Sequence, residues 1–185
     1  MILMAVAVLT TLAVTAQKVY GDKPGWTVYT AVDEYTDKKS YYLRYYNERR
    51  ELAASYFPGT SKMAVLEWYD GVLFFDVTLE AVTERRGQIP DDEIKYEWRV
   101  TMPEIEPVEV SGTAKMTYGD VEMAGDTFFG TFVFEMDTDW MKWGTTVAVK
   151  WYDPMRGKIV VRKIPLTGFT RCYNECLRRY GVKER

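Results

Sequence analysis

Apolar and polar residues alternate along most of the chain after residue 38, and this period of two is the pattern of half-buried β-strands. In residues 93–102, charged or hydroxyl-bearing side chains separate five apolar ones: Ile94, Tyr96, Trp98, Val100 and Met102. Turn residues interrupt the alternation repeatedly. The pattern predicts eight strands, at residues 39–47, 63–69, 72–82, 93–102, 113–118, 127–136, 145–152 and 158–164.

The segments between and beyond these strands are predicted to be turns, loops and two helices. Asp70-Gly71 separates two of the strands by two residues and favours a type I′ hairpin. Longer loops are predicted at residues 48–62, which Pro58-Gly59 interrupts, and at residues 82–92. In residues 169–180 the apolar side chains recur every three or four positions, which predicts an amphipathic helix. A second, short helix is predicted at residues 27–37.

This inventory is all-β. Eight antiparallel strands are typical of an up-and-down barrel whose interior holds one small ligand, here with the C-terminal helix packed outside. A two-sheet sandwich uses similar pieces. The short turns between successive strands favour the barrel.

The first sixteen residues form an apolar leader without a charged side chain. Small residues at Val14-Thr15-Ala16 precede Gln17, as at a signal-peptidase site. The alternative, a membrane anchor, needs about 20 apolar residues, and polar residues follow too soon. We therefore expect a signal peptide at residues 1–16, a single domain at residues 17–185, an extracellular location and no membrane association.

Composition narrows the chemistry. A net charge of −3 argues against nucleic acid as the main partner. The chain has no histidine, which excludes Ser-His-Asp and Cys-His catalysis and histidine zinc sites. A lysine or paired-carboxylate mechanism remains open, but no motif favours one, so we expect no enzymatic activity, no metal and no cofactor.

The two cysteines, Cys172 and Cys176, are too few for a disulfide framework. Four residues apart on a helix, they are poorly oriented for bridging each other. Two outcomes remain open: a pair of buried thiols in a monomer, or a bridge that links two chains.

Several features together resemble the tick salivary lipocalins: the leader, Pro24-Gly25-Trp26, the aromatic strand Tyr41-Tyr42-Leu43-Arg44-Tyr45-Tyr46, eight strands and a terminal helix with Cys172. The resemblance implies a lipocalin barrel in arthropod saliva that captures a host mediator. In that family, buried carboxylates are implied to bind the ammonium group of histamine or serotonin.

The family's motif positions carry other residues in this chain. Thr146 and Lys158 stand where the family's Asp and Glu would stand, with the spacing to Cys172 retained. The cysteine that commonly pairs with the helix is missing near Ser61-Lys62-Met63. The resemblance therefore implies that the frame is kept and that the amine ligands at these positions are lost.

Aromatic residues make up 15% of the chain and supply the candidate ligand site. They either fill the interior or line a cavity. The candidate ligand-binding residues are Tyr42, Arg44, Phe75, Tyr96, Trp98, Phe132, Phe134 and Trp151.

Three charged residues decide between ligand classes. Arg44 would anchor a carboxylate if its face points inward, and is solvated if that face points outward. Asp76 and Glu135 lie within apolar strands and would meet a buried amine if they point inward. The alternative is that both are exposed.

These observations favour a secreted carrier of a small, largely apolar ligand, such as a fatty acid or an eicosanoid like a leukotriene. One alternative is a binder of a biogenic amine. Another is a surface-mediated inhibitor of a host protein, in which the barrel is filled and loops 48–62 and 82–92 carry the function.

Overall fold

The computed structural model describes residues 19–70, 93–118, 127–153 and 157–182. The predicted signal peptide, the Asp70-Gly71 hairpin, the strand at 72–82 and the loop at 82–92 lie wholly or partly outside these residues, as do Phe75 and Asp76. Within them the chain forms β1 (Gly25–Val32), β2 (Lys39–Tyr46), β3 (Leu52–Phe57), β4 (Lys62–Asp70), β5 (Glu93–Thr101), β6 (Val108–Tyr118), β7 (Thr127–Glu135), α3 (Thr138–Trp143), β8 (Thr146–Asp153), β9 (Lys158–Pro165) and α4 (Phe169–Arg179).

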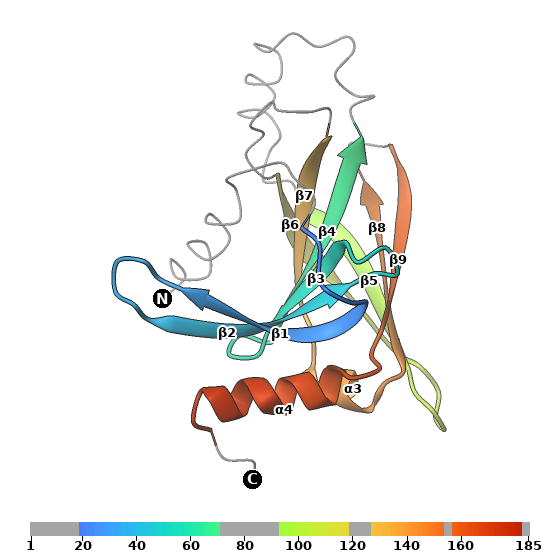
Figure 1. Cartoon of the computed structure of the whole chain (residues 1–185). Helices are drawn as coiled ribbons and strands as arrows, with labels where there is room; N and C mark the ends of the chain where they lie inside the picture. The colour runs from blue at the N-terminus through green and yellow to red at the C-terminus, as the bar shows by residue number, and fades with distance from the viewer. Residues whose placement is uncertain (1–18, 71–92, 119–126, 154–156, 183–185) are drawn as a thin grey trace, which may run out of the picture.

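All strand pairs are antiparallel, in the order β1-β2-β3-β4-β7-β6-β5-β8-β9. At β6 this strand order divides into two sheets (Figure 1). The first sheet contains β1, β2, β3, β4 and β7, and the second contains β5, β8 and β9, with β6 shared between them. Residues 108–115 of β6 pair with β5, whereas residues 116–118 pair with β7. The all-β class is therefore confirmed.

The closed barrel is not found in the described part of the chain. No ladder joins β1 to β9 there, and pairing is not sequential, since β4 pairs with β7 and β5 with β8. Alternation within a strand predicts its two faces, but it contains no information on which strand lies beside it.

Two segments differ from their predicted state. The helix predicted at residues 27–37 is wrong, because β1 pairs with β2 along its whole length, from Gly25↔Tyr46 to Val32↔Lys39. The predicted loop at 48–62 contains β3, which ends at the Pro58-Gly59 turn. The other predicted strands in the described residues are confirmed, with shifted ends.

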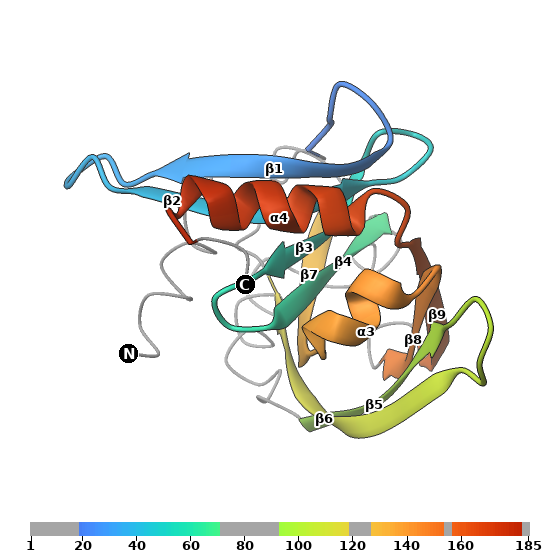
Figure 2. The same cartoon turned by 90° about the horizontal axis from the view of Figure 1, so that it is seen from below.

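The C-terminal helix is confirmed as α4. It buries Phe169, Cys172 and Cys176 and packs against β1, β2 and the short helix α3. Figure 2 shows α4 running along β1 and β2 with α3 beside it. At its far end the Tyr180 hydroxyl accepts from the Tyr41 amide at 2.8 Å and lies 2.9 Å from the Tyr41 carbonyl, to which it donates.

The core lies between the inner faces of the two sheets. In the second sheet, cross-strand rows place Tyr96 beside Trp151, Trp98 beside Val149, and Val149 beside Arg162. In the first, Val65 lies opposite Phe132 in the β4–β7 ladder. Trp26 on β1 contacts β9, since its Nε1 donates a hydrogen bond to the Pro165 carbonyl at 2.7 Å.

Candidate ligand-binding site

Five of the predicted site residues meet between the two sheets. Tyr96, Trp98 and Trp151 come from the second sheet, and Phe132 and Phe134 from β7. Phe132 stacks on Trp151 with ring centroids 5.1 Å apart and planes 9° from parallel. Tyr96 contacts Phe132 at 5.6 Å and Phe134 at 5.5 Å. These rings therefore pack directly against one another.

The same cluster contains buried polar hydrogen-bonding groups. The Nε1 atoms of Trp98 and Trp151 are buried and have no hydrogen-bond acceptor among the residues that the structure describes. Buried indole N–H groups normally have one. Burial, followed by the charge of Glu135, raises the pKa of the Tyr96 hydroxyl, which hydrogen-bonds the Glu135 backbone. Two donors on one wall are therefore available to an oxygen atom.

An ion pair crosses from β4 to β9. Arg162 Nη2 donates to Glu67 Oε2 at 2.6 Å, and Arg162 Nε contacts Glu67 Oε1. Glu67 shares its face of β4 with the core residues Met63 and Val65. Its side chain is 2% exposed, whereas that of Arg162 is 43% exposed. The pair thus joins a carboxylate fixed inside the molecule to a cation that reaches water.

Neither half of this pair was singled out from the sequence. Glu67 stands between Leu66 and Trp68 in an apolar strand, the same signal that drew attention to Asp76 and Glu135. Glu135 is exposed at the end of β7, on the face opposite Phe132 and Phe134, so it does not point into the interior. The alternation in residues 63–69 put Glu67 on the face of Met63 and Val65 and was the signal that was missed.

Arg44 and Tyr42 lie on the other face of the first sheet, opposite the core residues Leu43 and Tyr45. Arg44 is 4% exposed, so its face of β2 points away from the core and yet its side chain is not solvated. Its guanidinium lies 3.4 Å from the Tyr29 ring centroid, and Nη2 donates to the Tyr42 hydroxyl at 2.9 Å. Its Nε is buried and has no hydrogen-bond partner within the described part of the chain.

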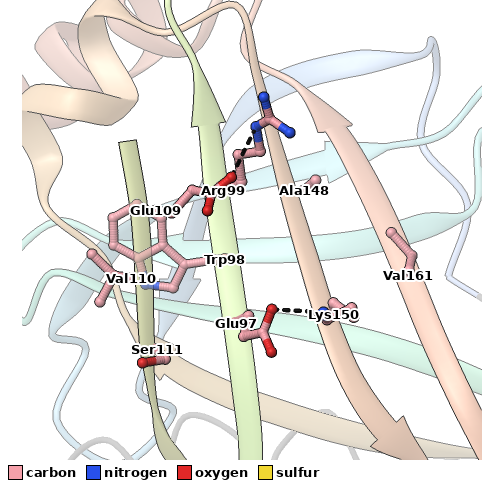
Figure 3. Close-up of a pocket in the computed structure, with 9 residues that line it drawn as sticks. All are labelled: Glu97, Trp98, Arg99, Glu109, Val110, Ser111, Ala148, Lys150 and Val161. Atoms are coloured by element: carbon pink, nitrogen blue, oxygen red, sulfur yellow. Dashed lines mark ion pairs between the residues drawn. The ribbon is translucent and has the colours of Figure 1, made fainter. Parts of the chain in front are cut away.

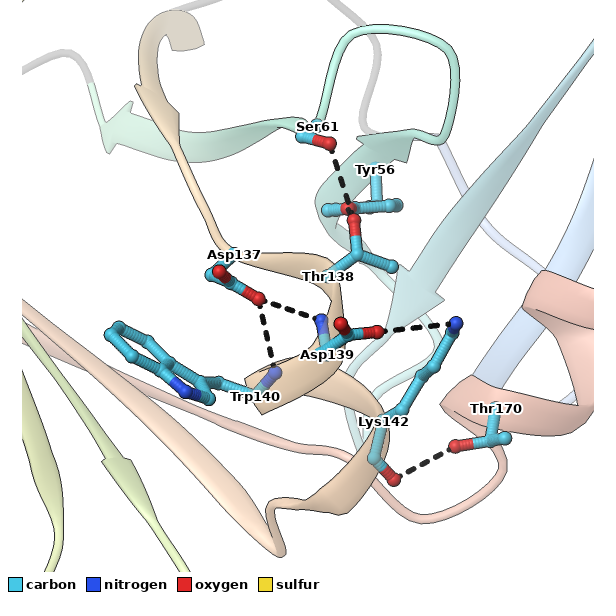
Figure 4. A network of polar contacts seen from close by, with 8 residues as sticks. All are labelled: Tyr56, Ser61, Asp137, Thr138, Asp139, Trp140, Lys142 and Thr170. Carbon is cyan, nitrogen blue, oxygen red and sulfur yellow. Dashed lines mark hydrogen bonds and ion pairs between the residues drawn. The ribbon is translucent and has the colours of Figure 1, made fainter.

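One end of the interior is closed by α3. Asp137 caps this helix by accepting from the amides of Asp139 at 2.8 Å and Trp140 at 3.4 Å. The Thr138 hydroxyl lies 2.5 Å from that of Tyr56 and 3.2 Å from that of Ser61 (Figure 4). Trp140 then packs on Trp98, with ring centroids 5.6 Å apart.

A groove of about 500 Å³ lies on the outer face of the second sheet. Two ion pairs cross its floor, Lys150–Glu97 at 2.6 Å and Arg99–Glu109 at 3.4 Å (Figure 3). All four side chains are about half exposed or more. The groove is therefore a polar surface, unlike the aromatic interior.

Both cysteines are free and buried in α4. Cys172 donates from Sγ to the Trp26 carbonyl at 3.3 Å. Burial raises the pKa of Cys172, and it raises the pKa of Cys176 to about 11. Neither thiol presents an exposed sulfur to a second chain.

No family model matches the chain, and neither does any curated protein or solved structure. Among the described residues, none of the helices has the length and apolar character needed to span a bilayer.

Proposed function

We propose that the protein is a secreted, non-enzymatic, lipocalin-like carrier of a small organic amine, with Glu67 as the counter-ion of the ligand's ammonium group. The observation that carries the proposal is a carboxylate 2% exposed on an aromatic inner face, paired with a cation that is 43% exposed. Ligand pockets are mostly apolar with a few placed polar groups, and this face has that composition.

The unequal burial of the pair selects the charge of the ligand. A ligand ammonium that replaces Arg162 releases a side chain that already reaches water. A ligand carboxylate that takes over Arg162 would instead deprive the buried Glu67 of this partner. Breaking a buried ion pair in this way costs about 3–5 kcal/mol. A cation is therefore the better competitor, and the amine alternative is favoured over the fatty acid.

The surrounding rings suit the same ligand. The inner faces of the sheets are rich in aromatic rings, among them Tyr96, Phe132 and Trp151, and an organic cation over a ring face that is not stacked on another ring gains roughly 0.5–2 kcal/mol. The indole N–H groups of Trp98 and Trp151 are available to a ligand oxygen.

The lipocalin resemblance supports secretion and carriage. Antiparallel strands and the helix with Cys172 fit it, and the closed barrel remains part of the proposal. At the family's carboxylate positions, Thr146 is half-buried and Lys158 is exposed. Glu67 on β4 would then do the work that those positions do in the family.

Calorimetric titration of tryptamine and tryptophol tests the proposal, because the two differ in an ammonium against a hydroxyl group. We expect tryptamine to bind near one-to-one, tryptophol to bind weakly, and Glu67→Gln to weaken tryptamine by about thirtyfold or more. Glu97→Gln is the matched control, since Glu97 is also mid-strand and ion-paired but exposed. Equal affinity for both ligands, or for both variants, would contradict the proposal.

A second candidate is the surface-mediated inhibitor of a host protein. It is favoured by the direct contacts among the interior rings and by the charged groove outside β5, β6, β8 and β9. Complement and clotting assays test it. Inhibition that survives Glu67→Gln and is lost in Lys150→Glu would favour this candidate.

A further inference from the structure

The outer face of β1, β2 and β3 carries a buried cation, the guanidinium of Arg44. Arg44 is 4% exposed, and no carboxylate pairs with it among the described residues. A guanidinium stays charged in proteins, so it cannot avoid the cost of burial by losing a proton. Its buried Nε still has a hydrogen to donate.

Strand register gives this cation polar neighbours on both sides. Thr27 on β1 and Ser55 on β3 are the cross-strand partners of Arg44. Partners directly opposite each other project from the same face. A row of hydroxyl, guanidinium and hydroxyl groups therefore crosses three strands.

The next row is aromatic. Tyr29 is the cross-strand partner of Tyr42, and the two rings lie 5.1 Å apart. Phe57 extends the row, with its ring 5.1 Å from that of Tyr42. A polar row beside an apolar row matches a molecule with an acidic head and an apolar body.

Tyr29 covers the cation. Its ring lies 3.4 Å from the Arg44 guanidinium, and the residue is 37% exposed. Tyr29 is the more exposed of the two rings over this guanidinium, since Tyr42 lies 5.4 Å from it and is 3% exposed.

We propose that this face is a second ligand site, in which Arg44, Thr27 and Ser55 bind the carboxylate of an amphipathic anion whose apolar body lies on Tyr29, Tyr42 and Phe57. It is independent of the amine site, because it lies on the opposite face of the sheet and takes the opposite charge. The planar fork of arginine matches a carboxylate with two parallel hydrogen bonds.

Titration of decanoate against its neutral ester, methyl decanoate, tests the site by calorimetry. We expect decanoate to bind and the ester to bind at least about tenfold more weakly. Arg44→Gln should lower decanoate affinity about tenfold or more, with Arg44→Lys intermediate because lysine keeps the charge and lacks the fork. Arg99→Gln, at an exposed mid-strand arginine, should leave it unchanged.

A nuclear magnetic resonance measurement on the wild-type chain does not depend on the folding of a variant. Decanoate should shift the Nε–H resonance of Arg44 at the concentrations that saturate the calorimetric signal. Absence of decanoate binding, equal binding of the ester, or a stationary Arg44 resonance would overturn the site. None of these results bears on tryptamine binding at Glu67.

Discussion

Glu67 and Arg162 show how two residues of one ion pair differ in what they lose when the pair is broken. Glu67 is enclosed by the core side of β4, whereas Arg162 reaches solvent from the edge strand β9. Removing Arg162 lowers the stability of the fold, because the buried Glu67 carboxylate loses this cation. Removing Glu67 costs less, because water can solvate the Arg162 guanidinium.

We therefore expect Arg162→Gln to destabilise the free protein by about 2–4 kcal/mol, because it removes the cation that pairs with the buried Glu67. Glu67→Gln should cost less. The measurement is urea unfolding with and without tryptamine. Tryptamine should restore part of the stability of Arg162→Gln and none of that of Glu67→Gln, and equal effects on both variants would contradict the pairing argument.

The stacked rings predict a large packing effect at Phe132. Phe132 is fully buried and contacts Tyr96, Phe134 and Trp151. Phe132→Ala should lower the free energy of unfolding by about 3–5 kcal/mol. Tyr152→Ala is the control: it removes an aromatic ring from the exposed face of β8 and should change stability by less than about 0.5 kcal/mol.

The buried thiol of Cys176 gives a pH dependence of defined sign. Its pKa rises from 9.0 to about 11 on folding, so the folded state holds this proton more tightly than the unfolded state. The stabilising effect is complete below pH 9 and is lost between about pH 9 and 11. Urea unfolding at pH 7 and pH 10.5 should show a smaller decline for Cys176→Ala than for the wild type. An identical decline would exclude this contribution.

At single positions, the alternation of residues along a strand predicts which side chains share a face. It placed Trp98 with Tyr96 on one face of β5 and separated Arg44 from Leu43 and Tyr45. It did not reveal which face of β2 is buried, and both are. Glu67 is a further case, since nothing in its own strand shows that Arg162 lies opposite it, 95 residues along the chain.

The short helix α3 closes one end of the interior between the two sheets. It is capped by Asp137 at its start and by Gly144 at its end, and the Gly144 amide donates to the Trp140 carbonyl at 2.8 Å. A Cβ added at Gly144 would lie 2.3 Å from Val100 Cγ1 and 2.9 Å from that carbonyl. The helix end therefore has no room for a side chain.

Gly144→Ala should cost about 1–3 kcal/mol, because β5 or the end of α3 must move. Gly59→Ala is the matched control, since nothing lies within 4 Å of a Cβ at that turn. Thermal unfolding of the two variants measures the difference. A Gly144→Ala variant as stable as the Gly59→Ala variant would mean that the contact is relieved without cost.

At the scale of elements, the strands that alternate strongly were predictable and three other elements were not. The sequence predicts a helix over most of β1, although Trp26 and Val28 pack into the core with β-strand spacing. β3 is buried on both faces through Leu52, Ala54 and Ser55, so it does not alternate. α3 has six residues, too few for a helical period to stand out.

At the scale of the whole molecule, strand order was the feature that the sequence did not determine. Short turns suggest that successive strands pair, yet β4 lies beside β7 and β5 beside β8. These pairings bring Phe132 against Trp151 and Glu67 near Arg162, so the candidate site depends on contacts between distant segments. Such contacts follow from the packing of both sheets together and not from any local pattern.

Strand β6 gives one way to watch the two sheets separately. Its backbone pairs with the second sheet up to residue 115 and with the first sheet from residue 116. Amide hydrogens exchange with solvent at rates set by the opening of the unit they belong to. If the sheets open as separate units, protection changes abruptly along this single strand. If the two sheets open as one unit, the protection is uniform along β6. A ligand that contacts both inner faces is expected to make the protection uniform.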